Sequence, residues 1–88
     1  MSVLEQKGVV EILLFLLEEE RAADISDMRK KLSIGHSALY SALEKLKKAG
    51  LIEEKKRREF PFNRFFLLTS KGKKVAEYLA EIERVLRE

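Results

Sequence analysis

The sequence of 88 residues contains no cysteine and only one histidine. Without cysteine the chain can form no disulfide, no thiolate nucleophile and no cysteine-ligated zinc or iron–sulfur site. The single histidine, His36, cannot build a metal site or a catalytic triad by itself, and the sequence has no glycine-rich phosphate loop. We therefore expect that the protein is not an enzyme and that it needs no metal and no cofactor.

Long apolar runs are missing as well. The longest run extends from Ile12 to Leu17, far short of the roughly 20 residues of a membrane-spanning helix. No basic segment followed by an apolar stretch and a cleavage site is found near the first residue. These features predict a soluble cytoplasmic protein without a membrane partner, and the length suits one domain over residues 1–88.

The charge is distributed unevenly along the chain, although the net charge is only +3. Residues 29–74 hold fourteen Lys or Arg against four Glu, whereas residues 1–28 hold two basic against seven acidic side chains. A positive block of this density in a small domain favours a polyanionic partner, with a lysine-rich solvated surface as the alternative.

Hydrophobic periodicity and turn residues predict four helices and one basic hairpin. The expected ranges are 2–19, 24–33, 36–49 and 70–88 for the helices and 51–69 for the hairpin. Asp24 and Asp27 resemble a capping box at the start of the second helix. Gly50 is expected to end the third helix, which a tight turn with Gly35 joins to the second.

Two segments resemble the winged helix-turn-helix of the MarR and PadR group of transcriptional regulators. They are LSIGHSALYSALEKLKKAGLIEEK and RFFLLTSKGKKVAEYL, with leucines leading into AGLI, a basic hairpin, and a return strand that ends in LTSKG before a helix. The resemblance covers about residues 8–80. It implies an α+β, mostly α fold with a three-helix core, a two-stranded β-wing and a C-terminal dimerisation helix. It also implies binding of double-stranded DNA, and thus association with the nucleoid.

The resemblance makes residues 36–49 the recognition helix, whose first turns would enter the major groove. The residues expected to contact DNA are His36, Ser37, Tyr40, Ser41, Lys45, Lys47 and Lys48. Tyr40 lies off the leucine stripe, so we place it at the DNA surface rather than in the core. For Ser37 a helix N-cap is the competing role, and we favour it. Glu44 is expected on the same side, where phosphates repel it unless it pairs with a lysine or accepts from a cytosine amine.

The hairpin corresponds to the wing, and it concentrates cations. Lys55, Lys56, Arg57, Arg58 and Arg64 are expected to contact the DNA backbone or the minor groove. Phe60 and Phe62 flank the proline of the predicted tip, where we favour packing under the wing over contact with sugar or with a partner subunit. Near Ser41 the chain lacks the arginine that reads guanine in related helices, so we expect affinity to come mostly from phosphates and shape.

Three apolar surfaces exceed what one small domain can cover. They are the first helix, one face of the return strand, and the stripe from Val75 to Leu86. We therefore favour a homodimer through the first and last helices, and the alternative is that the last helix folds back on the first within one chain. The sequence identifies no small-molecule effector.

Three functions fit these patterns to different degrees. The favoured function is that of a transcriptional regulator that binds double-stranded DNA. The alternative is an architectural, largely sequence-nonspecific chromosomal protein on the same plan, which gains weight from the weak set of base-reading residues. A module that binds only proteins would predict a neutral wing, and this wing is basic.

Overall fold

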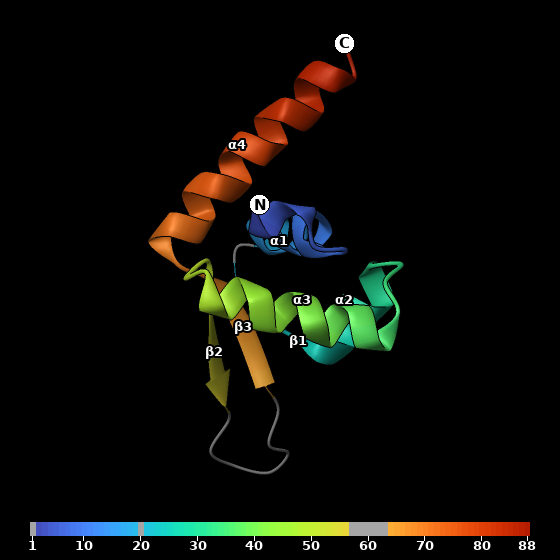
Figure 1. Cartoon of the computed structure of the whole chain (residues 1–88), viewed down its shortest axis with the longest axis vertical. Coiled ribbons are helices and arrows are strands. Elements are labelled where there is room, and N and C mark those ends of the chain that lie inside the picture. Colours follow the sequence, from blue (N-terminus) through green and yellow to red (C-terminus); the bar gives the residue numbers. More distant parts are fainter. Residues whose placement is uncertain (1, 20, 57–63) are drawn as a thin grey trace.

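The computed structural model describes residues 2–19, 21–56 and 64–88. Over these ranges the chain forms a short 3₁₀ helix, η1, four α-helices and three strands. Their bounds are Val3–Glu5 for η1, Val9–Glu19 for α1, Ala23–Asp24 for β1, Ile25–Lys31 for α2, His36–Lys48 for α3, Ile52–Lys56 for β2, Arg64–Leu68 for β3 and Ser70–Leu86 for α4. In Figure 1, α3 crosses in front of the wing strands and α4 extends away from them.

The first helix begins later than the sequence predicts. α1 starts at Val9 rather than Ser2, because Gly8 adopts a left-handed φ of 88° and separates η1 from α1. A Cβ at Gly8 would also lie 3.1 Å from the side chain of Ile34. Apolar residues continue through η1 and α1 alike, so the hydrophobic pattern could not reveal this break.

The helix-turn-helix starts with the capping box that the sequence predicts. Asp24 accepts a hydrogen bond of 2.8 Å from the backbone N–H of Asp27, and Asp27 accepts one of 3.3 Å from that of Asp24. The helix that follows, α2, ends at Lys31 rather than Ser33, because Leu32 already has extended backbone angles. The turn to α3 is thus slightly longer than expected.

Gly50 ends α3, as predicted. Its φ is 75°, and its N–H donates to the carbonyl of Lys47, while the N–H of Leu51 donates to that of Leu46. These two bonds form a Schellman motif, which favours glycine at the left-handed position. The motif turns the chain directly into β2.

The described residues form a three-stranded antiparallel sheet in the order β1-β3-β2. The sequence predicts only the two wing strands, because the two residues of β1 are too few to show a period. The register places Glu54 opposite Phe66, and Lys56 opposite Arg64. Opposed residues project from the same face of a sheet, so these four side chains share one face.

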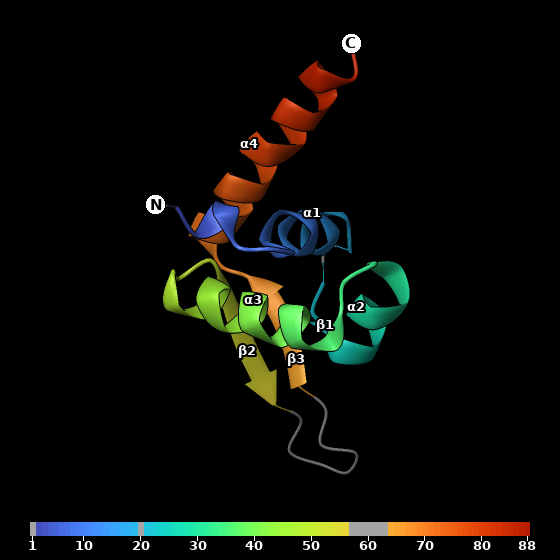
Figure 2. The ribbon, with the colours of Figure 1, turned by 45° about the vertical axis from the view of Figure 1, so that its right-hand side comes forward.

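The core surrounds α1. Five of its apolar residues are buried, and α4 covers one side of the helix while α3 and the sheet cover the other (Figure 2). The first half of α4 therefore folds back on α1 through Val75, Ala76 and Leu79. For this half of α4 the structure thus has the alternative arrangement, in which the last helix folds back on the first within one chain. The packing covers most of the apolar surface of α1.

Together these elements form a winged helix-turn-helix. α1, α2 and α3 make the three-helix core, β2 and β3 are the wing, and α4 follows as a further helix. The predicted α+β, mostly α fold class is confirmed, with β1 added to the wing sheet.

The start of α4 is fixed against the end of α3. The Thr69 hydroxyl donates to the carbonyl of Gly50 at 2.7 Å and accepts from the N–H of Gly72 at 2.9 Å. A Cβ added at Gly72 would lie 1.8 Å from the carbonyl oxygen of Leu51. The glycine thus allows a close approach between α4 and Leu51, which lies between α3 and β2.

We expect Gly72→Ala to lower the free energy of unfolding by about 3 kcal/mol, because the backbone has to shift to accommodate the methyl group. Urea unfolding measures the change. Lys74→Ala, at an exposed position of the same helix, is the control and should stay within about 0.5 kcal/mol of the wild type. A Gly72→Ala protein as stable as the control would contradict this close approach.

Candidate nucleic-acid interface

The recognition helix α3 has a buried side and an open side. Leu39, Ala42, Leu43 and Leu46 are buried in the core. Ser37, Ser41, Glu44, Lys45 and Lys48 are exposed. The helix therefore presents small hydroxyls in its first half and lysines in its second half to the outside, in the order that the sequence predicts.

α3 starts at His36 as predicted, but its N-cap residue differs from the favoured one. Gly35 occupies the N-cap position, and no side chain caps the helix. The favoured N-cap role of Ser37 is therefore wrong, because Ser37 already lies inside the helix, and its side chain is exposed. Ser41 accepts a hydrogen bond of 3.2 Å from the side-chain amide of Gln6, which places the segment before α1 beside the recognition helix.

Tyr40 lies at the edge between α3 and the wing. It is half-buried, and its ring stacks obliquely on that of His36, with centroids 4.6 Å apart. The Arg64 guanidinium lies 5.8 Å from the centroid of the Tyr40 ring and 5.4 Å from that of Phe66. At these distances a cation is attracted to the faces of both rings.

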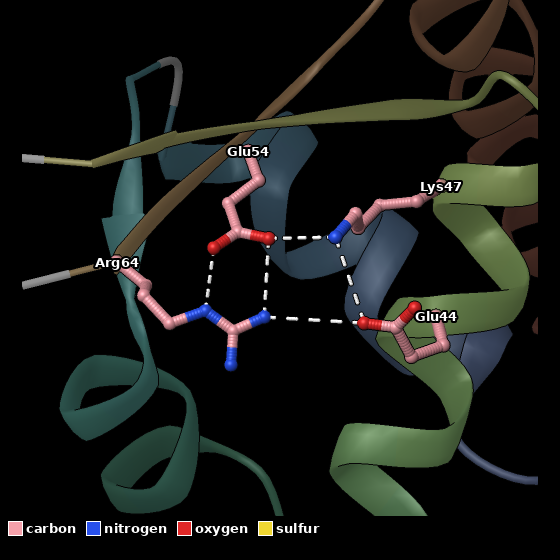
Figure 3. Close-up of polar contacts among 4 residues, drawn as sticks. All are labelled: Glu44, Lys47, Glu54 and Arg64. Carbon is pink, nitrogen blue, oxygen red and sulfur yellow. Dashed lines mark hydrogen bonds and ion pairs between the residues drawn. The ribbon is translucent and has the colours of Figure 1, made fainter.

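Glu54 of β2 connects the wing to α3 (Figure 3). Its carboxylate accepts hydrogen bonds of 2.5 and 3.1 Å from the Arg64 guanidinium and one of 2.7 Å from Lys47 Nζ. Glu44 extends the network, because its Oε1 lies 3.5 Å from Lys47 Nζ and 3.9 Å from Arg64 Nη2. The predicted repulsion at Glu44 is thus offset by two neighbouring cations.

The ion pairs dominate the electrostatics of this network. Hydrogen bonds from Arg64 and then Lys47 lower the pKa of Glu54 from 4.5 to about 2, although burial of the carboxylate acts in the opposite direction. The hydrogen bond to Glu54 likewise raises the pKa of Lys47 and that of Arg64. At neutral pH the network contains two carboxylates and two cations, and its net charge is zero.

The structure separates the predicted DNA-binding cations into two groups. Lys47 and Arg64 are paired with carboxylates. Lys45, Lys48, Lys55 and Lys56 are exposed. Arg57 and Arg58, together with Phe60 and Phe62, lie outside the described residues.

Sequence reasoning missed Glu54, which lies in the charged segment of the predicted hairpin and was given no role. A signal was present, because Glu54 is two residues from the buried Ile52 and side chains two apart project from the same face of a strand. That alternation places the Glu54 carboxylate on the same face of the wing as Ile52. This is the inner face, which is directed toward α3.

Neither a metal-binding cluster nor a membrane-spanning helix is found in the part of the chain that the structure describes. No group of three or more His, Cys, Asp or Glu there could hold a metal ion. No helix in the same ranges combines the length and the apolar character needed to cross a membrane.

We expect Glu54→Gln to make stability less dependent on acidic pH. The pKa of Glu54 in the folded protein, about 2, lies below its ordinary value of 4.5, so the ionised carboxylate stabilises the fold above pH 4.5. This contribution is lost as the pH falls from 4.5 toward 2. The difference in unfolding free energy between wild type and variant should therefore be largest at neutral pH and shrink in acid.

Urea unfolding at several pH values measures that difference. Glu53→Gln removes the same charge from an exposed position of the same strand, and its effect should be small at every pH. A Glu54→Gln effect that stays constant from neutral pH to acid would contradict the assignment.

Comparison with known proteins agrees with this architecture. The family model described as HxlR-like helix-turn-helix matches residues 3–88. No curated protein matches the chain significantly. The match over nearly the whole chain confirms the predicted resemblance to winged helix-turn-helix regulators.

Several solved structures have the same fold. A transcriptional regulator homologue from Pyrococcus horikoshii is 23% identical, with 97% of this chain and 85% of that chain covered and a TM-score of 0.80. A protein from Porphyromonas gingivalis assigned to the MarR family is 25% identical, with 98% and 83% covered and a TM-score of 0.81. Another MarR-family protein, from Enterococcus faecalis, is 17% identical, with 97% and 76% covered and a TM-score of 0.84.

Proposed function

Because the chain belongs to the HxlR-like helix-turn-helix family, we propose that it regulates transcription by binding double-stranded DNA as a homodimer. The observation that carries this proposal is the position of α3 beside the wing strands, seen in both views (Figures 1 and 2). The open side of α3 and the wing together display four exposed lysines, at positions 45, 48, 55 and 56. In the cell such a protein acts in the cytoplasm and joins the nucleoid when bound.

The two halves of α3 have different roles in this proposal. The first half enters the major groove, where His36, Ser37, Tyr40 and Ser41 lie within reach of base edges or adjacent phosphates. Lys45 and Lys48 in the second half meet the sugar–phosphate backbone, and Lys55 and Lys56 do the same from the wing. The open side of α3 has no Arg, Asn or Gln for bidentate base contacts, so phosphates supply most of the affinity.

The lack of Arg, Asn and Gln on the open side of α3 favours a second candidate function, that of an architectural DNA-binding protein with little sequence preference. With few base-reading side chains, binding would depend on the phosphates and on the shape of the duplex. Comparison of a preferred duplex with a scrambled one separates the two functions.

The proposed dimer uses the second half of α4. Tyr78, Ile82, Val85 and Leu86 are 71, 53, 52 and 73% exposed. Their spacing of four, three and one residues aligns them along one side of the helix, and an apolar stripe of this kind favours a second copy as its cover. Most of α1 is covered within the chain, so its share of the interface is smaller than the sequence predicts.

DNA affinity is expected to fall steeply with salt, because bound lysines release counterions from the phosphates. Lys48→Ala should weaken binding to all duplexes and reduce the slope of log K against log salt by about 0.9 for each of the two Lys48 side chains of the dimer. Tyr40→Ala should instead change the preference among sequences. Fluorescence anisotropy titrations with a genome-selected duplex and a scrambled one measure both effects.

Arg87→Ala is the control for these titrations, because Arg87 is exposed near the C-terminus, at the end of α4 far from α3 and the wing (Figure 1). Equal affinity for the two duplexes at every salt concentration would favour the architectural function. Binding that is independent of salt and unchanged in both variants would contradict the interface.

Sedimentation equilibrium tests the dimer. The double variant Ile82→Gln, Leu86→Gln should convert a dimer into a monomer of 10.2 kDa at micromolar concentration, because it removes apolar surface from the stripe. Lys74→Gln, at an exposed position of the same helix, should leave the dimer intact. A wild-type protein that sediments as a monomer would contradict the proposed interface.

A further inference from the structure

We propose that Glu54 is a positioning residue that withholds Lys47 and Arg64 from DNA phosphates and uses them to hold the wing against the recognition helix. The inference rests on the proposed DNA binding and deepens it. It assigns contact with phosphates to the exposed lysines at positions 45, 48, 55 and 56, and it removes two of the predicted cations from that role.

The geometry of the carboxylate supports this assignment. Glu54 accepts from two nitrogens of Arg64, and its Oε1 also accepts from Lys47 Nζ, so both oxygens are occupied. Paired donors of this kind form the strongest hydrogen bonds between side chains. The Glu54 side chain is only 10% exposed, and those of Lys47 and Arg64 are 32 and 35% exposed, so solvent and salt screen these pairs less than they screen fully exposed pairs.

Arg64 is also held by contacts that a phosphate could not replace. Its guanidinium lies near the Tyr40 ring on one element and the Phe66 ring on another, and Phe66 is fully buried. If Arg64 moved outward to a phosphate, the Glu54 carboxylate would lose its main partner while nearly buried. Only Lys47 would then balance the nearly buried carboxylate, and loss of one partner of such an ion pair is destabilising.

The network joins two elements that must bind the duplex together. Lys47 and Glu44 belong to α3, whereas Glu54 and Arg64 belong to β2 and β3 (Figure 3). A helix in the major groove and a wing on the backbone can engage one duplex only if their spacing is fixed. The Lys47–Glu54 pair and the contacts of Arg64 with Glu44 and Tyr40 join α3 to the wing and fix that spacing before DNA arrives. The cost is two cations that no longer attract phosphates.

Glu54→Gln provides the first test. The neutral side chain releases Lys47 and Arg64, so the slope of log K against log salt should become steeper by about 0.9 for each cation that reaches a phosphate. Affinity for a scrambled duplex at low salt should rise several-fold, and discrimination against it should fall. Glu53→Gln makes the same change of charge on the opposite face of β2, and its slope should match that of the wild type.

The second test compares two adjacent lysines of α3 and does not depend on how well the Glu54 variant folds. Lys48→Ala should lower the slope by about 0.9 for each of the two Lys48 side chains of the dimer, whereas Lys47→Ala should leave the slope unchanged and lower the melting temperature. Equal losses of slope in these two variants would show that Lys47 contacts a phosphate and would overturn the proposal.

Two further outcomes separate this inference from the function on which it rests. A wild-type protein that binds no duplex even at low salt overturns the proposed function. A wild-type protein that binds, together with a Glu54→Gln variant that melts earlier but keeps the slope of Glu53→Gln, overturns only the positioning role. In that case Glu54 is purely structural.

Discussion

The ion pairs of one nearly buried carboxylate hold the wing of this protein in place. Apolar packing extends up the wing only as far as Ile52 on β2 and Phe66 on β3. Beyond these residues the face of the wing that carries Glu54 and Phe66 continues with Lys56 and Arg64, which are polar. Glu54 supplies the next contact to α3 by accepting a hydrogen bond from Lys47, and it binds Arg64 within the wing. The pairs form on the inner face of the sheet, where exclusion of water makes charge-assisted hydrogen bonds strong and makes an unpaired charge costly. The position of the wing relative to α3 in the candidate DNA-binding face therefore depends on the nearly buried ion pairs of Glu54.

This arrangement divides the charged residues by task. Lys47 and Arg64 are neutralised by Glu44 and Glu54, whereas Lys45, Lys48, Lys55 and Lys56 remain exposed. A count of lysines and arginines thus overstates the charge that a duplex would meet. The same division applies to apolar residues of α4, whose first half packs on α1 while its second half is exposed. In both cases some residues of an element stabilise the fold, and its other residues are exposed and available to a proposed partner.

Several features were predictable because they depend on residues close together in the chain. The capping box of Asp24 and Asp27 and the glycine that ends α3 each involve neighbours within a few residues, and the structure contains both. Other local predictions were wrong where a competing effect decided. Gly8 divides a continuous apolar pattern by its backbone angle, and Gly35 rather than Ser37 precedes the first turn of α3. The strand β1 could not be predicted, because its two residues form a strand only by pairing with β3.

By itself, the sequence determined the order of the helices and the wing, the winged helix-turn-helix class, and the concentration of positive charge between residues 29 and 74. These follow from periodicity, turn residues and composition, which are properties of the chain read in order. The tertiary structure alone decided which of those charges are paired. Glu54 meets Lys47 and Arg64, seven and ten residues away, only because the strand register and the rotation of α3 about its axis bring the three side chains to one point. The register depends on which face of the strands is buried, and the rotation of α3 results from packing of the whole core.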